Sequence, residues 1–215
     1  MDGTATAALI KEITMRVIRE LAETDDPRRV VVGVSNRHAH LSAADLKTIF
    51  GLDAMTVFRP VRQPGEFAAE QTVTIHGPKA SFAKVRLMGP CRPKSQVELS
   101  RTDCIALGIE APITQSGHLE HAAAIDLEGP NGRVRLEHGA IVAARHIHLG
   151  PGHAAALGVA DQDLVRVRID GQRGGVLDNF IVRIKPEWIP EIHLDTDEAN
   201  ALNLRTGDHV TIVED

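Results

Sequence analysis

The sequence has 215 residues, of which 43% are hydrophobic and 25% charged, a composition typical of a soluble globular protein with one or two cores. Its net charge of −5 and aromatic content of 3% argue against nucleic acid as a partner, because such binders usually carry a basic excess and aromatic stacking platforms. Two cysteines are too few for a disulfide scaffold, and no segment resembles a transmembrane helix or a secretory signal. We therefore expect a cytoplasmic protein that does not bind membranes.

The first 30 residues are predicted to form a helix and a linker. Apolar side chains recur at spacings of three and four over residues 5–22, which indicates an amphipathic helix, and residues 24–29 are polar. Such a helix could pack on the body of the protein or on a second subunit. The alternative is a targeting or docking peptide.

A His-x-His pair occurs twice, each time after an apolar β-type run. His38 and His40 form the first pair, and His146 and His148 form the second. Side chains two apart on a strand point to the same face, so each pair could chelate a metal ion. A single pair could equally be surface or hydrogen-bonded histidines, but the repetition favours metal binding.

Similar segments follow the two pairs, Glu98 and His193, and each runs for one and a half to two helical turns. A Ser or Asp with an acidic residue three places later indicates an N-cap in three of these four places. The sequence therefore predicts four strand-to-helix units, whose helices end at a Gly or Asn: Gly51, Gly108, Gly158 and Asn203.

The polar residues ahead of these helices form one candidate ligand set: His38, His40, Glu98, His146, His148 and His193. Six ligands exceed the needs of one tetrahedral zinc ion but suit two ions with open coordination positions, which are typical of catalytic sites. We expect two Zn²⁺ per chain.

Short β-type runs separated by Gly and Pro fill the rest of the chain and favour small barrels over an open parallel sheet. We expect a mainly β fold with short helices, built by internal duplication, with the active site at the seam between halves. The first half spans residues 31–143 and the second 144–215, joined by the strand around residues 31–40. The expected strands after the first unit are 56–61, 73–76, 83–87, 96–99, 133–136, 140–144, 164–169, 180–184, 191–194 and 210–213.

Two residues in a Gly-Pro-rich turn are candidates for a role in binding or catalysis. Arg92 lies between Pro90 and Pro93, where a rigid turn could hold its guanidinium for bidentate phosphate binding. Cys91 could be imagined as an acyl-accepting nucleophile, but a buried small apolar residue is the ordinary explanation for a lone cysteine.

Seven segments together resemble the PduL-type phosphate acyltransferases, the phosphate propanoyltransferase family, in order over nearly the whole chain after residue 5. They are residues 32–42, 62–70, 77–79, 85–90, 96–98, 145–148 and 193–201.

The resemblance implies that a short-chain acyl-CoA and phosphate are interconverted with an acyl phosphate and CoA, at a two-zinc site between two interlocked β-barrel domains. It assigns His38 and His40 to a metal whose coordination the CoA sulfur can complete, and Glu98, His146, His148 and His193 to the second metal. Arg92 matches the family's phosphate-binding arginine. The implied CoA contacts, with Arg59 in place of a Lys and Met88 in place of a Leu, are Ser35, Arg59, Arg86, Met88, His193 and Asn200.

We therefore predict a homo-oligomeric phosphate acyltransferase. Family members in microcompartments carry a further peptide ahead of the first helix; the predicted helix here begins within the first few residues, so a free cytosolic enzyme is favoured over one bound to a microcompartment shell. The alternatives are a binuclear metallohydrolase acting on a thioester or ester, and a non-catalytic metal-binding module.

Overall fold

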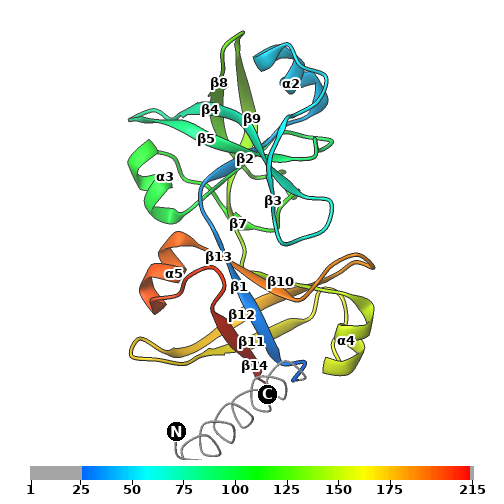
Figure 1. The fold of residues 1–215 in the computed structure, drawn as a ribbon. Coiled ribbons are helices and arrows are strands. Elements are labelled where there is room, and N and C mark those ends of the chain that lie inside the picture. Colours follow the sequence, from blue (N-terminus) through cyan, green and yellow to red (C-terminus); the bar gives the residue numbers. More distant parts are fainter. Residues whose placement is uncertain (1–25, 214–215) are drawn as a thin grey trace, which may run out of the picture.

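The computed structural model describes residues 26–213, so the helix predicted over residues 5–22 lies outside the described residues. The described chain is mainly β and forms two lobes, one above the other in Figure 1. Each lobe is a closed barrel of six strands, which confirms the predicted fold class. None of the described helices is both long enough and apolar enough to cross a membrane.

The first barrel, the upper lobe of Figure 1, closes in the order β4-β5-β2-β6-β9-β8 and back to β4. Two further strands, β3 and β7, extend it along β4 and β9. The strands are β2 (His38–His40), β3 (Val57–Pro60), β4 (Phe67–His76), β5 (Ser81–Gly89), β6 (Gln96–Leu99), β7 (Ile113–Thr114), β8 (Ala123–Glu128) and β9 (Arg133–Ala143).

The second barrel closes in the order β1-β13-β10-β12-β11-β14. Its strand β1 comes from the start of the described chain and pairs in parallel with β13 and antiparallel with β14. The strands are β1 (Arg29–Ser35), β10 (His146–Leu149), β11 (Leu164–Ile169), β12 (Gly175–Ile184), β13 (Glu191–Asp195) and β14 (His209–Val213).

The chain crosses between the barrels twice, and each crossing ends at a His-x-His pair. Strand β1 belongs to the second barrel, but after Asn36 and Arg37 the chain enters the first barrel as β2. It returns between β9 and β10, through Ala144 and Arg145. Both pairs therefore begin a strand at the junction of the two barrels. The strand around residues 31–40 is in fact two strands, one in each barrel.

The four predicted short helices are confirmed, and local capping explains their bounds. Ser42, Ser100 and Asp195 accept backbone N–H groups at three N-termini, while Gly150 begins the fourth without a side-chain cap. All four helices end at a residue in the left-handed conformation, which Gly and Asn adopt most readily. They are α2 (Ala43–Phe50), α3 (Arg101–Leu107), α4 (Pro151–Leu157) and α5 (Thr196–Leu202).

Each barrel has its own core, almost entirely aliphatic, as the low aromatic content requires. Leu41, Ile75 and Leu87 are fully buried in the first, and Ile147 and Phe180 in the second. These cores fix the backbones that carry the two His pairs, since Ala39 and Ile147, the middle residues of the pairs, are themselves fully buried.

One strand prediction was wrong and two strands were missed. The runs 133–136 and 140–144 form the single strand β9, because Gly139 lets the strand bend closely past Leu136, whose Cβ would lie 2.5 Å from a Cβ at position 139. Strands β7 and β8 were not predicted.

Candidate active site

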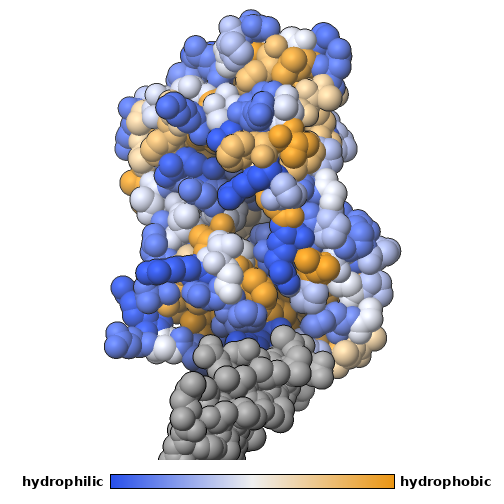
Figure 2. Space-filling model, in the orientation of Figure 1, coloured by the Kyte–Doolittle hydropathy of each residue, from blue (hydrophilic) through white to orange (hydrophobic). Residues whose placement is uncertain are grey.

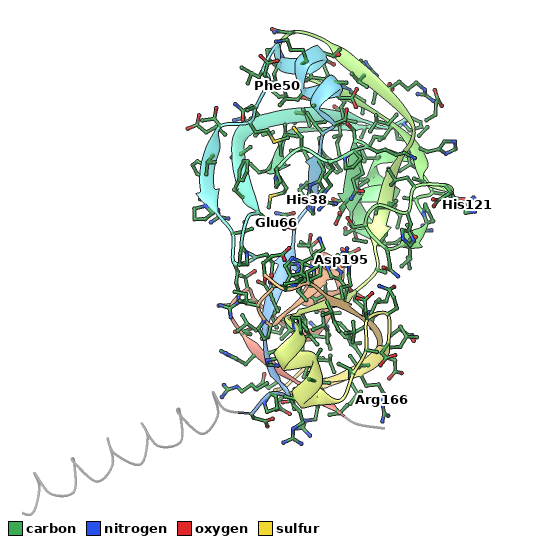
Figure 3. The ribbon with its side chains drawn as sticks, turned by 90° about the vertical axis from the view of Figure 1, so that its right-hand side faces the viewer. His38, Phe50, Glu66, His121, Arg166 and Asp195 are labelled. Carbon is green, nitrogen blue, oxygen red and sulfur yellow. The ribbon has the colours of Figure 1, made fainter. Side chains whose placement is uncertain are left out.

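A cavity of about 980 Å³ lies at the junction of the two barrels and is lined by residues from both. On the face shown in Figure 2, hydrophilic and hydrophobic side chains are mixed at the junction of the two lobes. Figure 3 places His38 of the first barrel and Asp195 of the second on the two sides of the junction. The lining includes all six candidate ligands as well as Arg92. The structure therefore brings together residues that are distant in the sequence.

The first group of candidate ligands is formed by His38, His40 and Glu98, whose donor atoms lie within 4.8 Å of one another. Strands β2 and β6 pair antiparallel with His38 opposite Glu98. His38 Nε2 lies 3.5 Å from Glu98 Oε2, and His40 Nε2 lies 3.7 Å from Glu98 Oε1. In the described part of the chain, this is the one group of three such ligands at that spacing.

Backbone carbonyls orient both rings of this group. Nδ1 of His38 lies 2.8 Å from Asn36 O, and Nδ1 of His40 lies 3.1 Å from Met88 O. A carbonyl only accepts hydrogen bonds, so each Nδ1 carries the proton and each Nε2 is left free. This second hydrogen bond is typical of metal-binding histidines.

The electrostatics of the first group favour the protonation states that bind metal. Burial opposes ionisation of Glu98, but the rings of His38 and His40 and the guanidinium of Arg92 together hold its pKa well below the usual range. Burial, with the neighbouring His38 and Arg92, lowers the pKa of His40 well below its usual value. At neutral pH the site therefore holds a carboxylate beside a neutral imidazole.

The second group consists of three histidine rings, those of His146, His148 and His193. Their ring centroids lie 4.7 to 5.1 Å apart. Strands β10 and β13 pair antiparallel with His146 opposite His193, and His148 follows two residues after His146 on the same face. The fold thus gathers the three rings, although their nitrogens are less closely grouped than the donor atoms of the first group.

Unpartnered nitrogens in this second group fit a metal ion. His146 Nδ1 lies 2.9 Å from Ala144 O, which leaves Nε2 free. His148 is 5% exposed, and neither of its ring nitrogens has a hydrogen-bond partner among the described residues. Burial and the neighbouring His193 lower the pKa of His146 to about 3, so its ring is neutral at neutral pH. A buried unpartnered imidazole is costly unless something binds it.

Glu98 lies beside the first pair in this geometry, because the antiparallel register sets it directly across from His38. Its implied assignment to the second metal stays a prediction. Its Oε1 also accepts hydrogen bonds from Gln96 Nε2 at 2.6 Å and Ser116 Oγ at 2.8 Å, so that Oε2 remains directed toward His38.

Arg92 lies at the same cavity and is held from two sides. Its backbone N–H donates to Leu41 O at 2.9 Å, and its Nη1 donates to Ser116 Oγ at 2.6 Å. Nη1 also lies 3.8 Å from Glu98 Oε1. The guanidinium is therefore placed beside the first ligand group, and its side chain remains 31% exposed toward the cavity.

Sequence reasoning missed a second cation, Arg183, on β12. Strand register sets it beside His148, and its guanidinium lies 5.3 Å from the ring centroid of Trp188, which stacks on His148 at 3.9 Å. Burial and the nearby charge of Arg92 lower the pKa of Arg183. Two like charges at one cavity indicate an anion site, but nothing in the local sequence separated Arg183 from other strand cations.

Five of the six residues implied as CoA contacts line this cavity. They are Ser35, Arg59, Arg86, Met88 and His193. Asn200 is exposed on α5 and lies outside the lining, so its contact with CoA stays a prediction.

Comparison with known proteins gives one consistent family. The family model described as phosphate propanoyltransferase matches residues 31–205. The phosphate propanoyltransferase of Thermotoga maritima is 48% identical over 187 residues, covering 86% of this chain and 89% of that protein. That of Rhodopseudomonas palustris is 48% identical over 188 residues, covering 87% and 83%, and that of Salmonella typhimurium is 45% identical over 192 residues, covering 89% and 91%. This chain therefore belongs to the phosphate propanoyltransferase family.

Proposed function

We propose that this protein transfers a short acyl group between CoA and phosphate in the cavity between its barrels. The observation that carries the proposal is the meeting of both His-x-His pairs, Glu98 and two arginines at one cavity. Family membership supports the same reaction, since the relatives compared above are all named phosphate propanoyltransferases.

Two zinc ions are proposed as the metals of this site. His38, His40 and Glu98 would hold one ion, and His146, His148 and His193 would hold the other. Imidazole nitrogen and carboxylate oxygen are ligands that zinc accepts, and three protein ligands leave a position open for substrate. When bound, zinc would act as a Lewis acid that polarises the reacting oxygen and stabilises the leaving thiolate.

The reaction proposed is a direct substitution at the thioester carbon. A phosphate oxygen forms the new C–O bond, the C–S bond breaks, and CoA leaves with the electron pair as its thiolate. Arg92 and Arg183 would hold the phosphate from two sides, so that one of its oxygens faces the thioester carbon.

An acylated cysteine is not part of this proposal. Burial raises the pKa of the Cys91 thiol, which therefore stays protonated at neutral pH and is a weak nucleophile. Cys91 packs against the core of the first barrel, as expected for a small apolar residue.

The experiment follows release of the CoA thiol and formation of acyl phosphate from propanoyl-CoA and acetyl-CoA, with and without phosphate. We expect the two products in equal amounts, with thiol release dependent on phosphate. Thiol release at the same rate without phosphate would indicate the metallohydrolase instead. A zinc-loaded protein with no turnover on any thioester or ester would indicate a non-catalytic metal-binding module.

The expected cytoplasmic location and homo-oligomeric state stay predictions. Cell fractionation and light scattering of the purified protein would test them.

A further inference from the structure

A buried glutamine of the first barrel reaches into the second barrel beside the proposed metal site. Gln63 lies between β3 and β4, in the loop that descends toward the second barrel in Figure 1, and is 1% exposed. Its Nε2 donates to Ile189 O at 3.1 Å and to Glu191 Oε2 at 2.6 Å, and its Oε1 accepts from Ile189 N at 3.4 Å. Both ends of its amide thus bind the second barrel.

The partner of this glutamine, Glu191, is a buried carboxylate that faces the second histidine group. It is 5% exposed and precedes His193 by two residues on β13, so the two side chains share one face. Antiparallel register also sets Glu191 opposite His148. Its Oε2 lies 3.2 Å from His193 Nε2, a nitrogen with no aligned hydrogen-bond partner among the described residues.

Gly33 on β1 makes room for this arrangement. Its register partner is His193, and a Cβ at position 33 would lie 2.8 Å from Glu191 Oε1 and 3.3 Å from His193 Cε1. Gly weakens a strand interior, and here its small size accommodates a close approach of side chains. The carboxylate therefore occupies a space that any larger residue at position 33 would restrict.

We propose that Glu191 and Gln63 are positioning residues for His193. This proposal rests on the function proposed above. In this role Glu191, whose Oε2 lies 3.2 Å from His193 Nε2, would accept the proton of Nε2 and leave Nδ1 as the free nitrogen, whereas His38, His40 and His146 are held through Nδ1. Gln63 in turn fixes the Glu191 carboxylate from the first barrel. The second metal site is thus completed by a contact that exists only when the barrels are docked together.

The test compares Glu191→Gln, Gln63→Glu and the double variant that exchanges the two residues, with the exposed Glu187→Gln as the charge-matched control. Two quantities are measured: the affinity for each zinc equivalent by chelator competition, and the unfolding midpoint of the metal-free protein. Outer-shell partners of metal ligands typically contribute on the order of 10- to 100-fold in affinity. Glu191→Gln should weaken one equivalent by about that factor, leave the other unchanged, and differ from the Glu187→Gln control.

The exchanged variant separates positioning from simple packing. Gln63→Glu alone brings two carboxylates together and should lower the unfolding midpoint, while the exchange restores a Gln–Glu hydrogen bond between the barrels. The midpoint should then recover, but zinc affinity should not, because no carboxylate faces His193. Recovery of both quantities, or wild-type zinc affinity in Glu191→Gln, would overturn the proposal.

A measurement on the metal-free protein distinguishes failure of this proposal from failure of the function on which it rests. Nitrogen-15 NMR of the metal-free protein, with the His193 signals identified by their loss in His193→Ala, should show the proton on Nε2, and Glu191→Gln should shift that tautomer. An unchanged tautomer combined with lost zinc would make Glu191 a ligand itself and contradict the positioning role. Wild-type protein that binds no zinc but shows the expected tautomer would contradict the metal proposal and leave the His193–Glu191 relationship standing.

Discussion

His38 and Glu98 face each other across the antiparallel pairing of β2 and β6, with 3.5 Å between His38 Nε2 and Glu98 Oε2. This register joins a carboxylate from one strand-to-helix unit to the His-x-His pair of another. It also sets the first ligand group beside Arg92, whose Nη1 lies 3.8 Å from Glu98. One strand pairing therefore organises both the proposed metal ligands and the proposed phosphate site.

Replacing Arg92 with Lys should be far from conservative, because Lys keeps the charge but loses the planar donor pair that grips phosphate. Loss of a positioned charge-assisted contact commonly costs on the order of 10² to 10³ in rate. We expect a loss of that size in kcat, together with a raised KM for phosphate, while zinc content and the KM for the CoA thioester stay near wild type. Steady-state kinetics would measure this, with the exposed Lys94→Ala as the control from the same turn.

If Arg92→Lys kept its phosphate kinetics and weakened only binding of the CoA thioester, Arg92 would belong to the CoA site. The phosphate pocket would then have to lie elsewhere in the cavity.

Replacing Arg183 with Lys should also weaken phosphate binding, because Arg183 lines the same cavity as Arg92, whose nearby charge lowers the pKa of Arg183. A hydrogen bond to a charged group contributes about 1.5 to 3 kcal/mol, so we expect the KM for phosphate to rise by roughly 10- to 100-fold. Arg168→Lys on β11, which does not line the cavity, is the matched control. An unchanged phosphate KM in Arg183→Lys would remove this residue from the phosphate site.

Cys91→Ala should retain most of the activity, because burial keeps the thiol protonated and the proposed reaction uses no acylated cysteine. Initial rates with propanoyl-CoA and phosphate would measure this. Mass spectrometry of the wild-type protein mixed with propanoyl-CoA alone should find no acyl group on Cys91. A trapped acyl-cysteine, or a ping-pong pattern that disappears in Cys91→Ala, would contradict direct attack by phosphate.

The metal-free protein should lose stability as the pH falls from 7.5 to 5.5. His146 has a pKa of about 3 in the folded chain, and burial also lowers the pKa of His40 and His148, whereas unfolded histidine titrates near 6.5. The unfolded chain therefore binds more protons across this range, which favours unfolding. Carboxylates with lowered pKa, such as Glu98, contribute only below about pH 4.5.

Urea unfolding with a chelator present would measure this dependence. The midpoint should drop between pH 7.5 and 5.5, and a variant with Asn at both 146 and 148 should show a smaller drop. A midpoint that rises or stays level in the wild-type chain would contradict neutral, buried histidines.

Local features of the fold were predictable from the sequence because neighbouring residues determine them. The helix caps at Ser42, Ser100 and Asp195 satisfy backbone groups within their own turn, and the left-handed ends need only Gly or Asn. The spacing of the His pairs likewise indicated ligands on one face of a strand.

Features that depend on tertiary pairing were not predictable in this way. The assignment of β1 to the second barrel rests on its pairing with β13 and β14, which no local pattern records. The same holds for Arg183, which becomes part of the site through its register with His148. Gln63 gains its role only through contacts with Ile189 and Glu191 of the other barrel.

The most direct test of the central claim is the zinc content of the purified protein and of two paired variants. We predict about two zinc ions per chain, because each ligand group supplies three protein ligands. Replacing both His38 and His40 with Ala should remove about one equivalent, and replacing both His146 and His148 with Ala should remove the other, each with nearly complete loss of phosphate-dependent thiol release. Full metal content in either double variant, with circular dichroism like that of wild type, would contradict a two-metal site divided between the barrels.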